Sequence, residues 1–247
     1  MLDYPRKTVG IVIPAFNEAR NLFHILDVVC RVRELKQIVV VDDGSTDGTL
    51  NIANHYVALD PRVVALNIPK NQGKASALLS GVRVLRSDFV LFIDADLLGL
   101  CPHHILQLYR PLEAGLCEMS IALFRRGRIL TTAAHRLTPF LTGQRGLLRD
   151  EAEHALIPLA ETRYGVETGL TIHARERGWR IQRTYWYGVT HIMKEEKKKR
   201  FIGLHNRWQM YQQIISVIAA EKNHLGILPL FPSKHDRSDS PPIKTLR

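Results

Sequence analysis

Four short apolar runs in the first hundred residues constrain the fold of this 247-residue chain more than any other feature. Each run has the length of a strand and is followed by a cluster of turn-forming polar residues, and helical periodicity lies between the runs. Nearly continuous apolar strands that alternate with helices predict an α/β fold, with a parallel sheet covered by helices on both faces. The predicted strands are 9–13 (ended by Pro14), 38–41, 63–66 and 89–93; the predicted helices bury Leu22, Ile25, Leu26 and Val29, span 49–59, and run from 71–74 through Leu85.

The second half is less regular and has no clean domain boundary. It predicts helices at 103–115 and within 165–177, strands at 119–124 and 180–189, and an amphipathic helix at 201–220. We therefore expect a single catalytic domain over residues 1–228, with a ligand-binding half at about 1–100 and a second half at 101–228. Residues 229–247 are rich in Pro, Ser, Lys and Asp, which predicts a flexible tail.

Composition narrows the class of protein. No apolar run reaches the roughly 18–20 residues that span a bilayer, and the first residues lack the apolar core of a signal peptide. Three widely spaced cysteines cannot form a disulfide framework. These observations predict a cytoplasmic protein, with peripheral binding at the inner face of a membrane as the alternative. The net charge of +10 indicates an anionic partner.

The strongest chemical signal is Asp94-Ala95-Asp96, directly after the fourth predicted strand. Ligands of α/β sheets bind beyond the carboxyl ends of the strands, and two such carboxylates can reach one divalent cation there. An ordinary acidic turn explains the pair equally well when it is taken alone. Three further clusters follow strands or begin a helix and favour a binding site; they are residues 14–18, 42–45 and 71–74. In the last of these, Lys74 and free N–H groups at a helix start would attract an anion.

The segments "TVGIVIPAFNE", "IVVVDDGSTDGT", "NQGKASAL" and "FVLFIDAD" together resemble the nucleotide-binding half of a family 2 glycosyltransferase with the GT-A fold. The resemblance implies a Rossmann-like, mostly parallel central sheet flanked by helices. It also implies a nucleotide-sugar donor and a Mn²⁺ or Mg²⁺ ion. Carried onto this chain, it makes Pro14, Ala15, Glu18, Asp42, Lys74, Asp94, Ala95 and Asp96 donor-binding residues, with Asp94 and Asp96 also holding the metal.

Two later segments carry a looser resemblance. "LTGQRGLLRD" resembles the family's segment that closes over donor and acceptor, which implies that Gly143, Gln144 and Arg145 face the donor. "RYGVETGLTIHARERGWRI" resembles the acceptor-side helix of glucosyl-3-phosphoglycerate synthases, which makes Glu167 a catalytic residue beside Asp96. In those enzymes a downstream histidine completes the metal site, a role that His191 would fill here.

The resemblance has one departure. Polyprenyl-phosphate sugar transferases commonly continue Asp-Ala-Asp-Leu-Gln, whereas this chain has Leu98 in place of the glutamine, which argues against such an acceptor. Glu167 would accept the acceptor proton in an inverting enzyme, or position the acceptor in a retaining one. The basic residues 125–128 would bind phosphates of the donor or the acceptor. The basic residues 194–200 would cover the bound donor or attract an anionic membrane, or would simply be a solvated run of charges.

The sequence therefore predicts a metal-dependent glycosyltransferase that moves a sugar, UDP-glucose being the favoured donor, to the hydroxyl of a small acceptor, phosphorylated or not. A peripheral membrane enzyme with a lipid or polyprenyl-phosphate acceptor is the first alternative, and a non-catalytic nucleotide-binding relic is the second. A sugar-nucleotide nucleotidyltransferase would carry a Gly-rich loop after the first strand, which residues 14–18 lack. A nucleic-acid partner is not expected, since no RNA-recognition signature is evident.

Overall fold

A seven-stranded sheet forms the centre of the protein in a computed structural model, which describes residues 7–125, 142–160 and 165–191. These residues belong to one compact unit, 1–203; the second unit, 204–247, lies outside the described ranges. The strand order is β3-β2-β1-β4-β7-β6-β8, and β7 alone runs against its neighbours. The strands are β1 Val9–Ala15, β2 Leu35–Asp43, β3 Val63–Ile68, β4 Phe89–Phe92, β6 Met119–Arg125, β7 Arg145–Leu148 and β8 Ile181–Tyr187.

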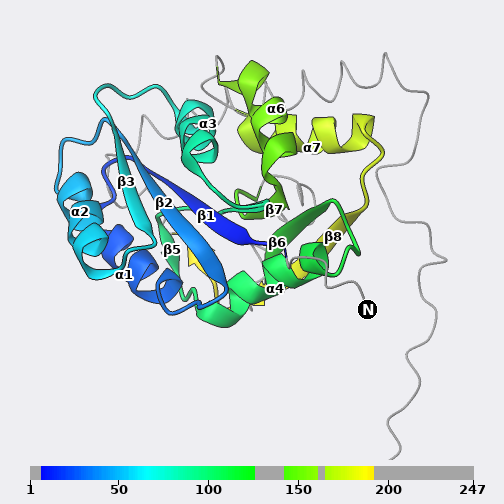
Figure 1. Ribbon diagram of the computed structural model, residues 1–247, viewed down its shortest axis with the longest axis horizontal. Coiled ribbons are helices and arrows are strands. Elements are labelled where there is room, and N and C mark those ends of the chain that lie inside the picture. Colours follow the sequence, from blue (N-terminus) through cyan, green and yellow to red (C-terminus); the bar gives the residue numbers. More distant parts are fainter. Residues whose placement is uncertain (1–6, 126–141, 161–164, 192–247) are drawn as a thin grey trace, which may run out of the picture. The chain divides into compact units, whose positions relative to one another are not determined.

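Helices cover both faces of this sheet, which confirms the predicted α/β class (Figure 1). One face packs against α1, α2 and α4, and the other packs against α3, α6 and α7. The helices are α1 Ala19–Val29, α2 Thr49–Leu59, α3 Lys74–Val84, α4 Pro102–Glu113, α6 Arg149–Leu159 and α7 Val166–Glu176.

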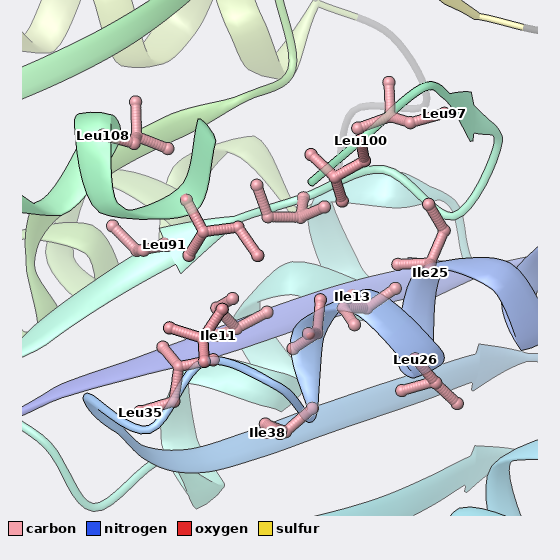
Figure 2. Packing of buried hydrophobic residues seen from close by; sticks show 14 of the residues in the cluster. Ile11, Ile13, Ile25, Leu26, Leu35, Ile38, Leu91, Leu97, Leu100 and Leu108 are labelled. Atoms are coloured by element: carbon pink, nitrogen blue, oxygen red, sulfur yellow. The ribbon is translucent and has the colours of Figure 1, made fainter. Parts of the chain in front are cut away.

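Strand residues supply the two hydrophobic cores alternately, because successive side chains of a strand point to opposite faces. Ile11 and Ile13 of β1 lie in the core with α1, whereas Val12 between them lies in the core with α3. Figure 2 shows the first core, where Ile25 and Leu108 approach the strands from two different helices. Each such buried side chain contributes roughly 1.5–3 kcal/mol relative to an exposed one. The unbroken apolar runs thus specify a sheet buried on both sides.

Pro14 does not end the first strand as predicted; β1 continues to Ala15. Its pairing with β4 stops at Val12, whose carbonyl accepts from the N–H of Ile93. Residues two apart in a strand point the same way, so the backbone of Pro14, like that of Val12, faces β4. Because the β1–β4 pairing has already ended at Val12, the missing N–H of Pro14 removes no hydrogen bond between these strands. On the other side Ala15 still pairs with Asp42 of β2.

The predicted elements of the second half are confirmed where the structure describes them, but β7, α6 and the two-residue strand β9 (Thr190–His191) were not predicted. β7 is a four-residue strand whose first residue is charged, and α6 contains Pro158, so neither shows clear periodicity. The predicted helix 201–220, the tail 229–247 and the basic residues 126–128 and 194–200 lie outside the described residues.

None of the helices within the described ranges is long and apolar enough to cross a membrane.

Candidate active site

Asp94 and Asp96 leave the carboxyl end of β4 in a strictly alternating segment. Ile93, Ala95 and Leu97 are buried in the core, at most 3% exposed, so that the aspartates between them point away from it. Six of the seven strands run in one direction, and their carboxyl ends share this edge of the sheet. The predicted carboxylate pair therefore lies where open α/β sheets bind ligands.

A second, two-stranded sheet brings His191 to this pair. Strand β5 (Leu97–Leu98) runs antiparallel to β9 (Thr190–His191), with Leu97 opposite His191. Nδ1 of His191 lies 3.0 Å from Oδ1 of Asp96. The turn after β5 requires a glycine, because Gly99 has a φ of +73° and any Cβ there would collide with the carbonyl of Gly188.

Asp94, Asp96 and His191 form a group that fits a divalent cation. One ligand atom from each lies within 4.8 Å of the other two. Two carboxylates and an imidazole are oxygen and nitrogen donors of the kind that Mn²⁺ accepts, and the carboxylates alone also suit Mg²⁺. Burial lowers the pKa of His191, but the hydrogen bond to Asp96 and the charge of Asp94 outweigh it and raise that pKa above its ordinary value.

Lys74 joins this group to the second half of the chain. Its Nζ lies 2.7 Å from Oδ1 of Asp94 and 2.6 Å from Oε1 of Glu167. Lys74 is the first residue of α3 and Glu167 the second of α7, so two helix starts meet at one amine. Burial opposes the ammonium form, but the two carboxylates raise the pKa of Lys74 above its ordinary value, and the same amine helps to lower the pKa of Asp94 despite its burial.

Gly143 and Gln144 contact the same aspartate. Nε2 of Gln144, a fully buried residue, donates to Oδ2 of Asp94 at 2.8 Å. A Cβ on Gly143 would collide with Oδ2 of Asp94 and lie 2.7 Å from Nζ of Lys74, so only glycine lets this backbone approach the pair. Both residues thus lie at the candidate site.

The side chain of Arg145 is buried and does not face the site, in contrast to the expectation that it faces the donor. Its side chain is 1% exposed and points into the sheet–helix interface. Nε donates to the carbonyl of Thr142 at 3.0 Å and a terminal nitrogen donates to Oγ1 of Thr171 at 2.8 Å. Burial lowers the pKa of Arg145 to about 10, although the charge of Glu167 opposes that shift.

The donor-binding residues predicted from the first half lie at the ends of β1 and β2. Ala15, Glu18 and Asp42 are at most 6% exposed, and Pro14 is half-buried. Oε2 of Glu18 accepts from the side-chain amide of Asn21 at 2.6 Å, and Oδ1 of Asp42 accepts from the N–H of Ser45. These carboxylates therefore hold their own loops in shape, at the edge that also carries Asp94.

In the cluster 71–74, two backbone N–H groups already donate to a carboxylate of the protein itself. The carboxylate of Asp43 accepts from the N–H groups of Gln72 and Gly73, both at 2.8 Å. The prediction of free N–H groups is therefore wrong for Gln72 and Gly73, which precede the first residue of α3. Of this cluster Lys74 alone reaches the aspartates after β4.

An aromatic stack behind His191 was not predicted. The ring of Phe124 lies 5.1 Å from that of His191 and stacks on Trp186, which stacks in turn on His104. Phe124 and Trp186 are register partners on β6 and β8, so the pairing of these strands builds the stack. Thr171, which bonds Arg145, was also missed; its position one helical turn after Glu167 was the available signal.

The same fold occurs in solved structures of a bacterial synthase. Glucosyl-3-phosphoglycerate synthase from Mycobacterium tuberculosis, in a complex described with Mn²⁺, UDP and glucosyl-3-phosphoglycerate, superposes with a TM-score of 0.63 at 23% identity. The superposition covers 91% of this chain and 82% of that one. A second complex of that synthase, with Mn²⁺, UDP and phosphoglyceric acid, gives a TM-score of 0.64 at 23% identity, over 91% and 80%. The predicted GT-A fold is thereby confirmed.

Residues 10–208 match the family described as Glycosyl transferase family 2, and the chain belongs to that family. A dolichyl-phosphate beta-glucosyltransferase from Trichomonas vaginalis is 35% identical over 94 residues, or 34% of this chain and 28% of that protein. An undecaprenyl-phosphate 4-deoxy-4-formamido-L-arabinose transferase from Yersinia pestis is 28% identical over 181 residues, or 70% and 54%. The chain thus spans about half or less of the length of these curated relatives.

Proposed function

We propose that this protein is a metal-dependent glycosyltransferase that moves a sugar from a nucleotide-sugar donor to the hydroxyl of a small acceptor. One observation carries the proposal: the ligand atoms of Asp94, Asp96 and His191 lie within 4.8 Å of one another, beside the Lys74–Glu167 ion pair. Sugar transfer from a nucleoside-diphosphate sugar needs a cation for the departing diphosphate and an acidic side chain near the acceptor, and this arrangement offers both. The catalytic domain is residues 1–228, as the sequence predicts.

The metal site consists of Asp94, Asp96 and His191. A bound Mn²⁺ or Mg²⁺ would supply the charge that stabilises the departing nucleoside diphosphate. The solved relatives support this choice, since their descriptions name Mn²⁺ with UDP in one complex and Mg²⁺ with UDP in another. Lys74 holds Asp94 in place by its ion pair and adds a positive charge beside the donor phosphates.

Glu167 works on the acceptor side, with Asp96 as the second catalytic carboxylate. In an inverting reaction Glu167 would take the proton of the attacking hydroxyl; in a retaining one it would position the acceptor. Proton NMR of the anomeric centre of the product distinguishes these outcomes. Pro14, Ala15, Glu18 and Asp42 shape the nucleotide pocket at the ends of β1 and β2, and Ala95, Gly143 and Gln144 complete the donor side. Arg145 is the buried residue that follows them in β7.

UDP-glucose is the favoured donor and a small phosphorylated molecule is the favoured acceptor. Support comes from the Mycobacterium tuberculosis synthase, whose complexes contain UDP-glucose and phosphoglyceric acid. The relatives named for dolichyl and undecaprenyl phosphate support a second candidate, a polyprenyl-phosphate acceptor at an anionic membrane surface. Leu98, which is 45% exposed where such enzymes commonly carry glutamine, favours the first.

The test is release of nucleoside diphosphate from a panel of nucleotide sugars with Mn²⁺. Asp96→Asn should lower turnover at least about 100-fold, which corresponds to about 2.7 kcal/mol of lost transition-state stabilisation. Asp88→Asn is the matched control, because Asp88 lies at the other end of β4 and bonds Thr8 instead. Equal turnover of the two variants, or no turnover by the wild type with any donor, would contradict the proposal.

The acceptor is tested with UDP-glucose and either 3-phosphoglycerate or a polyprenyl phosphate in anionic vesicles. Glucosylated phosphoglycerate supports the small phosphorylated acceptor. A glycolipid product, formed with binding to vesicles that weakens as salt is added, supports the membrane alternative instead.

A further inference from the structure

Arg145 is a buried charge at a junction of three elements. It begins β7 and is opposite Phe92 of β4 on one side and Ile121 of β6 on the other. Taking a guanidinium out of water costs several kcal/mol unless hydrogen bonds compensate for the loss of water. The hydrogen bonds of Arg145 to Thr142 and Thr171 provide this compensation, and they show which segments the guanidinium connects.

On α7 the guanidinium holds the backbone of Glu167 through one hydroxyl. Arg145 donates to Oγ1 of Thr171 at 2.8 Å, and this hydroxyl donates its own proton to the carbonyl of Glu167 at 2.9 Å. A hydroxyl that accepts from a cation becomes a stronger donor, so the two bonds reinforce each other. The relay therefore reaches from the sheet to the first turn of α7, where Glu167 lies.

On the other side the guanidinium holds the segment that touches Asp94. Its Nε donates to the carbonyl of Thr142, and Gln144 two residues later donates to Asp94. Asp94 and Glu167 are also the two carboxylates that share Nζ of Lys74. Arg145 and Lys74 thus connect the same two regions, the surroundings of Asp94 and the start of α7. Arg145 does so through backbone carbonyls and a hydroxyl, and Lys74 through the two carboxylates.

The buried apolar residues of α7 also pack against the sheet. Val166, Leu170 and Ala174 pack in the core shared with α3 and α6. Such contacts are non-directional and do not by themselves fix the rotation of a helix about its axis. A hydrogen bond has a preferred direction, so the relay is suited to setting where the carboxylate of Glu167 points.

We propose that Arg145 and Thr171 are positioning residues, which fix the backbone of Glu167 and thereby the separation of its carboxylate from Asp94. The inference rests on the proposed function for the role of Glu167. It assigns Arg145 to the support of the acceptor side, and not to direct contact with the donor.

Thr171→Val and Thr171→Ser test the relay, because valine keeps the shape of threonine without the hydroxyl and serine keeps the hydroxyl. We expect Thr171→Val to lower kcat about tenfold at saturating donor, or about 1.4 kcal/mol, while binding of UDP with Mn²⁺ stays unchanged. Thr171→Ser should retain kcat within about twofold of wild type, as a rescue by the conservative variant. Thr184→Val is the matched control, since Thr184 donates to the carbonyl of Ile121 on another strand.

Two results would overturn the inference: an unchanged kcat in Thr171→Val, or an equal loss in Thr171→Ser. Arg145→Lys should lower kcat further, because one ammonium cannot reproduce the forked geometry of the guanidinium.

Amide hydrogen exchange at Gly169, whose N–H donates to the carbonyl of Gly165 at the start of α7, provides a readout that needs no substrate. It should become about tenfold faster in Thr171→Val, as expected for the loss of about 1.4 kcal/mol of local stability, and not in Thr171→Ser. An inactive wild-type protein refutes the proposed function; unchanged exchange in Thr171→Val refutes the relay whether or not the protein is active.

Discussion

The loops that follow β1, β2 and β3 differ from the segments that the second half brings to the site. The loops are held by side chains of the first half alone: Asp43 binds the N–H groups of Gln72 and Gly73, and the side-chain oxygen of Asn17 accepts from the N–H of Thr46. In the second half, Gln144, Glu167 and His191 bond Asp94, Lys74 and Asp96, which lie 50 to 95 residues earlier in the chain.

This difference assigns different tasks to similar polar groups. The loop carboxylates of the first half, such as Asp43, satisfy backbone donors and so build a preformed frame at the edge of the sheet. Gln144, Glu167 and His191 of the second half instead bond side chains at the candidate site and so complete it. Substitutions in the first set should therefore lower the free energy of unfolding, whereas those in the second should lower metal binding and turnover at nearly constant stability.

Asp43→Ala should have the largest effect of the predictions that follow from this contrast. It leaves two backbone N–H groups without their carboxylate, in a residue that is only 4% exposed. Buried donors that lose a charged partner cost about 1–3 kcal/mol each, so we expect a loss of about 3 kcal/mol in the free energy of unfolding. Urea denaturation measures it.

Asp27→Ala is the control for Asp43→Ala. Asp27 forms an exposed i,i+4 ion pair with Arg31 and should contribute less than about 0.5 kcal/mol. If the two substitutions destabilise the protein equally, the loops are not the frame that the contrast requires.

His191→Ala should change binding and not stability. Removing one of three ligands should weaken Mn²⁺ binding and metal-dependent turnover by at least roughly 10- to 100-fold, the loss that follows when only a hydrogen-bond partner of a metal ligand is removed. Titration with Mn²⁺, followed by the spectroscopic signal of the free ion, gives the affinity. His24→Ala, at an exposed position of α1, should leave that affinity unchanged. An unaltered metal dependence in His191→Ala would remove His191 from the ligand set.

The same contrast explains what could be predicted from the sequence. The strands of the first half are apolar runs that alternate with helices, and Lys74, Asp94 and Asp96 follow directly from local segments at their ends. Glu167 and His191 could be proposed only through a resemblance, because their partners are distant in the chain. The hydroxyl of Thr171 and the stacking of Trp186 on Phe124 depend on how α7 and β8 pack, which no local pattern encodes. The resemblance implied that Arg145 faces the donor; its burial could not be predicted, because a charged residue in a four-residue strand gives no local sign of it.

An ion pair at the opposite edge of the sheet can show whether the second half stabilises the fold independently of the candidate site. Glu118 and Arg180 precede β6 and β8, at their amino ends, and the guanidinium lies 2.6 Å from Oε1 of Glu118. The side-chain and backbone hydrogen bonds from Arg180 lower the pKa of Glu118 to about 2, from an ordinary value of 4.5. Because the folded-state pKa is depressed, the stabilisation is complete above pH 4.5 and disappears as the pH falls toward 2.

Glu118→Gln should therefore lower the urea midpoint slightly at pH 7, and the difference from wild type should shrink steadily as the pH is lowered from 5 to 3. The effect is the smallest of the three, since both side chains are solvated and their attraction is screened by salt. Turnover should be unchanged, because the pair lies at the edge opposite Asp94. A midpoint difference that stays constant over this pH range would show that the charge of Glu118 contributes nothing. Reduced turnover at pH 7 would show instead that the second half acts as one unit with its site.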